Sequence, residues 1–218
     1  MLSVVIPTLN SAATLGRSLA AVAGADEIVV ADGGSADATV PIAESAGAAA
    51  VRSAPGRGIQ LRAGAEAARG DWLLFLHADT VPGPRWRAAA QAHIASAPEA
   101  AGTFRFRLDH PSARARVVER GVALRVALLG LPYGDQGLLI SRALYDAVGG
   151  YRPLPLMEDV DLVRRIGRRR LRLLGEEAVT SADRWRRDGW ALRSARNLGL
   201  LALYWLGVAP ERLARRYR

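Results

Sequence analysis

The sequence predicts a single α/β domain built on a mostly parallel β-sheet with helices on both faces. Short, almost wholly apolar segments recur through the N-terminal half, and stretches with helical spacing separate them. Strands that are buried on both faces carry such continuous apolar runs, so this order is typical of a parallel sheet. The length of 218 residues suits one sizeable core and is short for two independent domains.

The N-terminal half alternates predicted strands with predicted helices. Apolar runs predict strands at Leu2–Ile6, Glu27–Ala31, Ala49–Arg52 and Trp72–Leu76. Helical spacing predicts helices at Ala12–Ala23, Ala36–Ala46 and Gly58–Arg69. Ser35 directly precedes the second of these helices, and its hydroxyl is expected to act as the N-cap.

After Pro82 the pattern becomes richer in helices. The predicted helices are Trp86–Ala97, Ser112–Leu129, Ser141–Val148, Glu158–Arg168 and Gly189–Leu206. Thr103–Leu108 alternates like a half-exposed strand, Gly137–Ile140 is a short predicted strand, and an apolar segment follows at Leu171–Leu174. No internal repeat or low-complexity linker divides the chain.

The segment Ile28–Thr39, IVVADGGSADAT, places a carboxylate at the end of a predicted strand. Ligands of open α/β sheets bind beyond the carboxyl ends of the strands. Asp32 could accept hydrogen bonds there from a uracil-type base edge or a ribose hydroxyl. Gly33, Gly34 and Ser35 form a tight turn before a helix, whose N-terminus favours anions. A plain strand–turn–helix connection explains the same residues without any ligand.

A second carboxylate follows the most apolar predicted strand. In Leu73–Thr80, LLFLHADT, the apolar run leads into His77, Ala78 and Asp79. Asp79 is expected at the same edge of the sheet as Asp32. It could hold Mg²⁺ or Mn²⁺, because such hard cations bind through one or two carboxylates together with phosphate oxygens. His77 could ligate the metal, contact a phosphate or simply end the strand.

An acidic pair, Glu158 and Asp159, opens a predicted helix in the segment PLMEDVDLVRR. Acids at a helix N-terminus are stabilised by the helix dipole, which accounts for the pair without any catalysis. The alternative is a general base, because transfer of a group to a hydroxyl needs a carboxylate that accepts the proton. Asp161 could cap the helix or hydrogen-bond to its neighbours.

Two further segments place basic side chains beside turns or helix starts. Arg57 and Arg62 lie in GRGIQLRAG, and either could reach a diphosphate. Arg184 and Trp185 lie in SADRWRRDGW and could close over a pyrophosphate and a sugar. The start of a surface helix is the alternative for the second segment.

The polar turn YGDQG precedes the short strand predicted at Gly137–Ile140. Asp135 and Gln136 could bind the hydroxyl groups of an acceptor there. A solvated turn without any ligand explains the same residues.

The order of these segments resembles the family-2 glycosyltransferases. The matching segments are VVIPTLN, VADGGSADAT, GRGIQLRAG, GDWLLFLHADT, GDQGLLISR and MEDVDLVRR, and they extend over roughly Leu2–Arg165. The resemblance implies the nucleotide-diphospho-sugar transferase fold called GT-A, a nucleotide-sugar donor and inversion of the anomeric centre. It also implies one domain, 1–218, with a nucleotide-binding half, 1–82, and an acceptor and catalytic half with C-terminal helices, 83–218.

The resemblance also implies which residues bind the nucleotide. Pro7, Thr8 and Asn10 look like the nucleotide-binding end of the first strand, where the family often has an acid at the last position. Asp32 matches the carboxylate that contacts the nucleoside. Both assignments concern the first two predicted strands, so the nucleotide is expected beside them.

The metal and catalytic residues follow from the same resemblance, with one departure. Asp79 matches the final acid of the Asp-x-Asp metal motif, whose first acid is replaced here by His77. Metal dependence then rests mainly on Asp79. Asp159 matches the catalytic base, and Glu158 is its neighbour.

The C-terminal part narrows the resemblance. Arg184 and Trp185 resemble the Arg-Trp pair of some members, although the usual preceding glutamine is missing. The short length and the string LALYWLGVAPERLARRY resemble the small bacterial transferases described as arsenosugar-biosynthesis-type, or radical-SAM-associated.

The resulting hypothesis is a metal-assisted, inverting hexosyltransferase that uses Mg²⁺ or Mn²⁺ and a UDP- or GDP-linked sugar. A nucleotidyltransferase of related fold is the first alternative, but it normally has a Gly-rich, basic signature after the first strand, where this chain has TLNS. A degenerate nucleotide-sugar-binding protein without transferase activity is the second, because His77 replaces an acid.

Composition and charge limit the partners. The chain has no cysteine, which excludes disulfides and thiolate chemistry. The formal charge of +9 comes mostly from arginines in the C-terminal half, and they lack the interleaved aromatics of a nucleic-acid-binding surface. They could form a solvated surface or attract an anionic membrane. The acceptor could accordingly be a small molecule or lipid-linked.

Localisation is judged from the apolar segments. No apolar run reaches the ~20 residues of a membrane-spanning helix, and MLSVVIPTLN lacks the basic start of a signal peptide. A cytoplasmic protein is expected, with contact to the inner leaflet of the membrane as an option. The stretches Ser112–Leu131 and Arg193–Arg218 could form a homodimer interface, a membrane contact or core.

Overall fold

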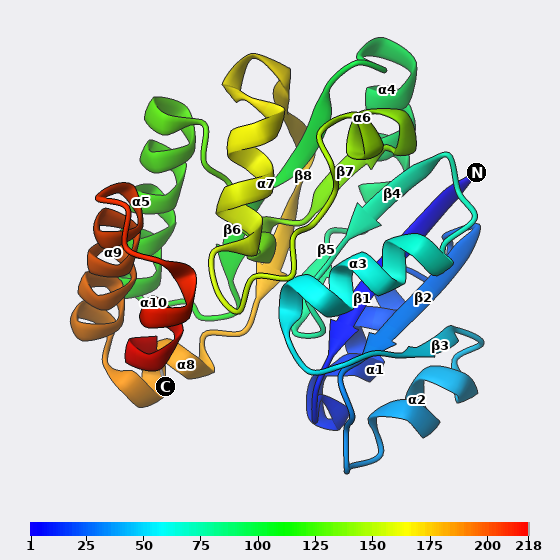
Figure 1. The fold of residues 1–218 in the computed structure, drawn as a ribbon, viewed down its shortest axis with the longest axis horizontal. Coiled ribbons are helices and arrows are strands. Elements are labelled where there is room, and N and C mark those ends of the chain that lie inside the picture. The colour runs from blue at the N-terminus through cyan, green and yellow to red at the C-terminus, as the bar shows by residue number, and fades with distance from the viewer. Residues whose placement is uncertain (218) are drawn as a thin grey trace.

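A computed structural model describes residues 1–217 and shows one eight-stranded sheet within them (Figure 1). The strands are β1 (Leu2–Thr8), β2 (Glu27–Asp32), β3 (Ala49–Arg52), β4 (Trp72–Phe75), β5 (Thr80–Pro82), β6 (Ala101–Leu108), β7 (Leu138–Ser141) and β8 (Leu171–Thr180). The α-helices are α1 (Ala12–Ala21), α2 (Thr39–Ser45), α3 (Arg57–Ala67), α4 (Trp86–Ser96), α5 (Ala113–Leu129), α6 (Arg142–Ala147), α7 (Glu158–Ile166), α8 (Asp183–Asp188), α9 (Trp190–Trp205) and α10 (Pro210–Tyr217).

The strand order is β3-β2-β1-β4-β7-β6-β8-β5. The strands β3, β2, β1 and β4 pair in parallel, as the sequence predicts. β7 runs antiparallel to both β4 and β6, while β8 is again parallel to β6 and β5 is antiparallel to β8. The predicted α/β fold with a mostly parallel sheet and flanking helices is therefore confirmed.

Alternate residues of β1 point into two separate cores. Val4 and Ile6 pack in one hydrophobic cluster with Leu15 and Leu19 of α1. Val5 packs in the other with residues of α3 and α7. Because side chains alternate along a strand, a wholly buried strand must be covered by helices on both faces of the sheet.

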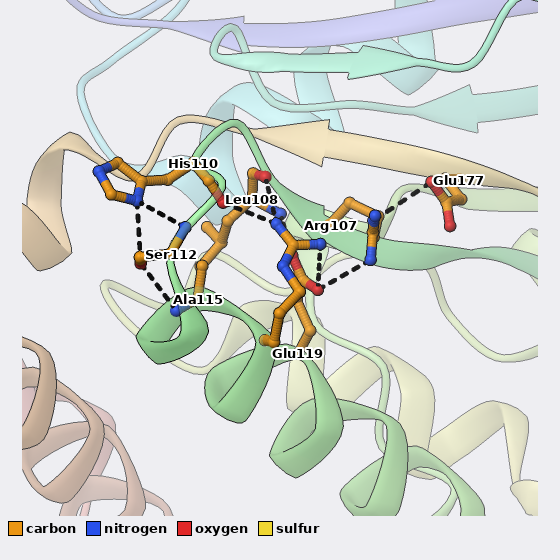
Figure 2. Close-up of polar contacts among 8 residues, drawn as sticks. Arg107, Leu108, His110, Ser112, Ala115, Glu119 and Glu177 are labelled. Carbon is orange, nitrogen blue, oxygen red and sulfur yellow. Dashed lines mark hydrogen bonds and ion pairs between the residues drawn. The ribbon is translucent and has the colours of Figure 1, made fainter.

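A buried acid anchors α5 to the sheet (Figure 2). The Glu119 carboxylate accepts hydrogen bonds from the Leu108 backbone N–H at 2.9 Å and from Arg107 Nη1 at 3.0 Å. Arg107 also contacts Glu177 of β8 at 3.4 Å. The Ser112 hydroxyl caps the helix by accepting a hydrogen bond from the Ala115 N–H.

The expected N-cap role of Ser35 is wrong. The helix begins at Thr39, and its N-cap residue, Ala38, makes no side-chain cap. The backbone N–H and hydroxyl of Ser35 both donate to Asp32, which holds residues 33–35 in a turn in place of the first helical residues. The helix N-terminus, expected at Ala36 directly after this turn, therefore lies at Thr39.

Other differences concern the C-terminal half. The strand predicted to be half-exposed is β6, and most of it is buried because it lies between β7 and β8. The apolar segment at Leu171–Leu174 is the start of β8, which continues to Thr180. The short elements β5, α8 and α10 were not predicted. Three to eight residues carry too little periodicity to identify an element.

The glycine at position 64 tests the close packing of α3 on the sheet. A Cβ added to Gly64 would lie 2.4 Å from Val5 Cγ1, so Gly64→Ala is expected to lower the free energy of unfolding by about 1–3 kcal/mol. Gly16→Ala in α1 is the matched control, because a Cβ there meets nothing within 4 Å. The control should be neutral or gain up to ~1 kcal/mol. Urea unfolding measures both, and equal stability of the two variants would contradict this packing.

Candidate active site

Two adjoining hollows lie beyond the carboxyl ends of β1 and β4. The first, here called the β1 groove, has a volume of about 510 Å³ and follows the loop Pro7–Ser11. The second, the α7 cavity, has a volume of about 110 Å³ and lies between the start of α7, Tyr133 and α9. The residues lining both hollows are Arg57, His77, Asp79, Leu156, Glu158, Ser181 and Arg184. The two hollows therefore share one wall.

The loop after β1 is held against the loop after β2. Asn10 has φ +50°, in the left-handed region that asparagine tolerates better than most residues. Its backbone N–H donates to the Ser35 hydroxyl, and its side-chain oxygen accepts from the Ala36 N–H at 2.9 Å. Pro7, Thr8 and Asn10 all line the β1 groove, where the sequence places them.

Asp32 supports the groove from behind and does not line either hollow. Its carboxylate accepts hydrogen bonds from the Thr8 hydroxyl and the N–H groups of Gly34 and Ser35, at 2.8–3.0 Å, and from the Ser35 hydroxyl. Burial opposes ionisation of Asp32, but the hydrogen bonds from Ser35, Thr8 and Gly34 outweigh it and lower its pKa. The ionised Asp32 carboxylate therefore holds the turn in place.

Four other predicted residues also line neither hollow: Gly33, Gly34, Ser35 and Arg62. Gly33 packs directly behind the groove, where an added Cβ would lie 3.0 Å from the Gln60 side chain. Arg62 is on the exposed face of α3 and pairs with Glu66 at 2.9 Å. Of the two predicted arginines of this helix, Arg57 alone lines the hollows.

His77 follows β4 and contributes to the shared wall. An added Cβ on Gly134 would lie 2.5 Å from His77 Nε2, so the turn before β7 packs closely against the imidazole. Burial, and then the positive charges of Arg57 and Arg184, lower the pKa of His77 well below its ordinary value. The imidazole is neutral at neutral pH and keeps a lone pair available.

The acidic pair lies at the start of α7, after a left-handed residue. Met157 precedes the helix with φ +65°, a strained conformation for this residue type and one that is often found at functional sites. Glu158 is 1% exposed, and its Oε1 lies 3.4 Å from Arg57 Nη1. Asp159 is less buried and accepts a hydrogen bond from the Gly134 N–H at 2.9 Å.

The turn before β7 places Asp135 in the α7 cavity and Gln136 behind it. Asp135 Oδ1 is buried and accepts no hydrogen bond from the described residues. Burial raises the pKa of Asp135 to about 6; Arg125 opposes this shift, whereas the nearby Asp159 adds to it. The Gln136 amide is 1% exposed and donates to the Phe104 carbonyl at 3.1 Å. Gln136 is therefore enclosed in the protein and does not reach the cavity.

The C-terminal wall of the cavity comes from α8 and α9. Arg184 is exposed and lines both hollows, whereas Trp185 is buried and lines the cavity. The guanidinium of Arg193 lies 5.1 Å from the Trp185 ring centroid, and Arg193 Nη1 pairs with Asp188 at 2.6 Å. Ala78, the remaining predicted residue, lies in the β1 groove.

Several lining residues were missed by sequence reasoning. Gln60 and Tyr133 lie inside the quoted motifs GRGIQLRAG and YGDQG, so the motifs themselves were the available signal. Arg193 and Asn197 line the cavity from α9. No recognisable motif marks this arginine-rich helical stretch in the sequence. Only the packing of α9 shows that these two residues lie at the cavity.

The shared wall suits a metal ion that retains ligands from a substrate. Within residues 1–217, no three His, Asp or Glu side chains gather closely enough to enclose a metal. The wall does offer the Asp79 carboxylate and the neutral His77 imidazole, while its other acid, Glu158, is buried and paired with Arg57. A divalent cation bound there would complete its coordination with phosphate oxygens and water.

Comparison with solved structures shows the same fold. Glucosyl-3-phosphoglycerate synthase from Mycobacterium tuberculosis superposes with a TM-score of 0.58 at 21% identity, covering 83% of this chain and 70% of the synthase. A 1–349 fragment of S. aureus TarS superposes with a TM-score of 0.64 at 18% identity, covering 83% of this chain and 60% of the fragment. No curated protein sequence matches this chain.

The sequence of the chain also matches a family model. The model of glycosyl transferase family 2 matches residues 3–148, which is more than half of the chain. This segment extends from the second residue of β1 past β7 and contains the residues Pro7, Asp32, His77 and Asp79 described above. The chain therefore belongs to glycosyl transferase family 2 and is a glycosyltransferase of that family.

Proposed function

We propose that this protein is an inverting, metal-assisted glycosyltransferase that moves a sugar from a UDP- or GDP-linked donor to an acceptor hydroxyl. The observation that carries the proposal is the wall shared by the β1 groove and the α7 cavity. Asp159 lines the cavity and not the groove, while His77 and Asp79 line both. A donor in the groove and an acceptor in the cavity would therefore meet between the diphosphate-binding residues and a carboxylate.

The β1 groove is the proposed donor site. Its volume of about 510 Å³ lies within the usual range for small-ligand pockets, roughly 300–1,000 Å³. Thr8 and Asn10 would contact the nucleoside, with Asp32 holding the turn behind them. Arg57 and Arg184 would face the diphosphate, for which guanidinium groups are well suited. The mycobacterial synthase was crystallised with UDP-glucose and Mn²⁺, and TarS with UDP, which supports a nucleotide here.

Asp79 and His77 would hold the divalent cation, Mg²⁺ or Mn²⁺. The replacement of an acid by His77 is compatible with this role, because a neutral imidazole is a metal ligand. When bound, the cation supplies charge neutralisation of the departing nucleoside diphosphate. Arg57 and Arg184 add positive charge from the protein itself.

Asp159 is the proposed general base and Glu158 its electrostatic neighbour. Glu158 is almost fully buried and is paired with Arg57, whereas Asp159 is partly exposed to the cavity. Asp159 would take the proton from the acceptor hydroxyl while its oxygen attacks the anomeric carbon. The bond from that carbon to the phosphate oxygen breaks on the opposite side, and inversion results. Positioning of the two substrates contributes much of the rate.

The acceptor is proposed to bind in the α7 cavity, where Tyr133 and Trp185 supply aromatic surface and Asp135 a buried carboxylate. Aromatic faces and carboxylates together suit a hydroxyl-bearing ligand. A relationship to the small transferases of the arsenosugar-biosynthesis type is part of this proposal and is supported by the C-terminal string LALYWLGVAPERLARRY.

Replacement of the proposed base gives the most direct test. Asp159→Asn keeps the shape and the Gly134 contact but removes the basic oxygen, so kcat should fall by about 10²–10⁴-fold. Calorimetric titration should show that UDP binding is retained. Asp146→Asn on the exposed face of α6 is the matched control and should transfer at the normal rate. Near-normal turnover of Asp159→Asn would exclude this assignment.

Metal binding is expected to require the nucleotide. Mn²⁺ alone should shift the melting temperature little, because the described residues provide no three-ligand site. UDP with Mn²⁺ should raise it by several degrees, corresponding to about 2–3 kcal/mol at saturating ligand. The Mn²⁺-dependent rise of the melting temperature should be lost in Asp79→Asn and retained in Asp146→Asn. An unchanged rise in Asp79→Asn would show that the metal binds at another position.

Glu158 should also link stability to pH. Burial, opposed by Arg57 and assisted by Asp159, raises the pKa of Glu158 from 4.5 to about 7. Between these values the folded protein holds a proton that the unfolded chain releases, so the free energy of unfolding falls as pH rises. Glu158→Gln removes this pH-dependent loss of stability. Its free energy of unfolding should therefore gain about 1–3 kcal/mol relative to the parent between pH 4.5 and 8.

Urea unfolding across this pH range measures the difference. Glu66→Gln is the control, because the Glu66 side chain is 65% exposed on α3. The change of relative stability with pH should be larger for Glu158→Gln than for this control. A flat difference for Glu158→Gln would contradict the raised pKa of Glu158.

A further inference from the structure

The outer face of α9 is wholly apolar and uncovered. Ala191, Ala195, Leu198, Ala202 and Trp205 follow each other at helical spacing, and all are exposed. Leu192 and Leu206 extend this face and are 70% and 81% exposed. A surface helix normally places charged or polar residues on its exposed side. The apolar exposed face of α9 therefore suits contact with an apolar or amphipathic partner.

A second apolar row lies on α5, beside α9 in Figure 1. Val117, Gly121, Leu124 and Leu128 are spaced along one side of this helix, and the three large side chains are 59–67% exposed. The inner side of α5 and Trp190 at the start of α9 pack in one hydrophobic cluster. We call the two exposed rows together the α5–α9 face.

Arginines border this face. Arg114 and Arg120 are exposed on α5, on either side of the row that contains Val117. The Arg164 guanidinium lies 4.8 Å from the Trp205 ring centroid, and Arg168 donates hydrogen bonds to the last carbonyls of α5. Apolar side chains in the centre with cationic side chains at the edge match the pattern of helices that lie in the interface of a bilayer.

Acidic side chains are missing from the same segments. Residues 112–133 contain one acid, Glu119, which is 7% exposed and hydrogen-bonded to β6. Residues 162–175 and 189–209 contain none. The burial of Glu119 in the network of Figure 2 leaves the exposed charge of α5 entirely positive.

We propose that the α5–α9 face docks on the surface of an anionic lipid bilayer. The leucines and Trp205 would enter the boundary between headgroups and acyl chains, and the arginines would contact the anionic headgroups. A second copy of this chain is the less suitable occupant. A twofold contact through this face would bring its arginine border against another arginine border without acids to pair with.

The docking surface is directly connected to the proposed acceptor site. Arg193, Asn197 and Leu200 on the opposite side of α9 line the α7 cavity. The same helix would thus face the bilayer on one side and the acceptor on the other. No helix in the described part of the chain is long and apolar enough to span a membrane, so docking would be peripheral.

Flotation with lipid vesicles tests the proposal without any substrate. The full chain should float with vesicles containing about 30% phosphatidylglycerol in phosphatidylcholine, and far less with phosphatidylcholine alone. Raising the salt from about 50 to about 500 mM should weaken the binding, because the headgroup attraction is screened. Leu124→Gln with Leu198→Gln should reduce the bound fraction about ten-fold, since two apolar contacts are removed.

Two charge variants give a matched comparison. Arg114→Gln with Arg120→Gln should reduce binding several-fold. Arg17→Gln with Arg52→Gln removes the same charge from exposed positions on α1 and β3, far from α5 and α9 in Figure 1, and should bind nearly as the parent does. Equal losses in both pairs would show that net charge, and not this face, drives binding.

Ultracentrifugation and urea unfolding complete the design. Unchanged stability of the leucine variant shows that its loss of flotation is a surface effect. Flotation of that variant at the parent's level would overturn the proposal. A parent protein that does not float but forms a dimer, which Leu124→Gln with Leu198→Gln dissociates, would assign the face to a second copy instead.

Discussion

The parallel pairing of β1 with β2 and β4 brings the polar groups that follow these three strands to one edge of the sheet. Thr8 and Asp32 are register partners at the end of the β1–β2 ladder, and the Thr8 hydroxyl donates to the Asp32 carboxylate. The end of β4 lies on the other side of β1, so the HAD segment after it reaches the same edge. Antiparallel pairing at any of these positions would send one of the three loops to the opposite edge, and the groove would lose a wall.

The shared wall gathers opposite charges in a partly enclosed space. Burial raises the pKa of Glu158 in this wall and of Asp135 in the adjoining α7 cavity, while burial and nearby arginines lower that of His77. Glu158 in particular costs folding stability at neutral pH. Strain accompanies this charge pattern, because Met157 adopts a left-handed conformation directly before the acidic pair. Such local costs are typical of sites whose geometry serves a reaction.

α9 lies between the α7 cavity and the protein surface. Its inner side carries Arg193 and Asn197 into the α7 cavity, and its outer side forms half of the apolar α5–α9 face. A bilayer contact on that face would hold the cavity close to the lipid surface. The Glu119 network serves the same arrangement, because it ties α5 to β6 and removes the single acid from the exposed side.

Local pattern in the sequence determined most strands and helices and the loops after β1, β2 and β4, because hydrophobic periodicity and Asp-Gly turns act over a few neighbouring residues. It also predicted His77, Asp79 and Asp159 as candidate site residues at the ends of such elements, and all three line the α7 cavity. Tertiary structure alone decided that Asp32 supports the groove from behind, that Gln136 is enclosed, and that Arg193 reaches the cavity. Those outcomes depend on contacts between residues far apart in the chain, and a single sequence carries no local pattern for such contacts.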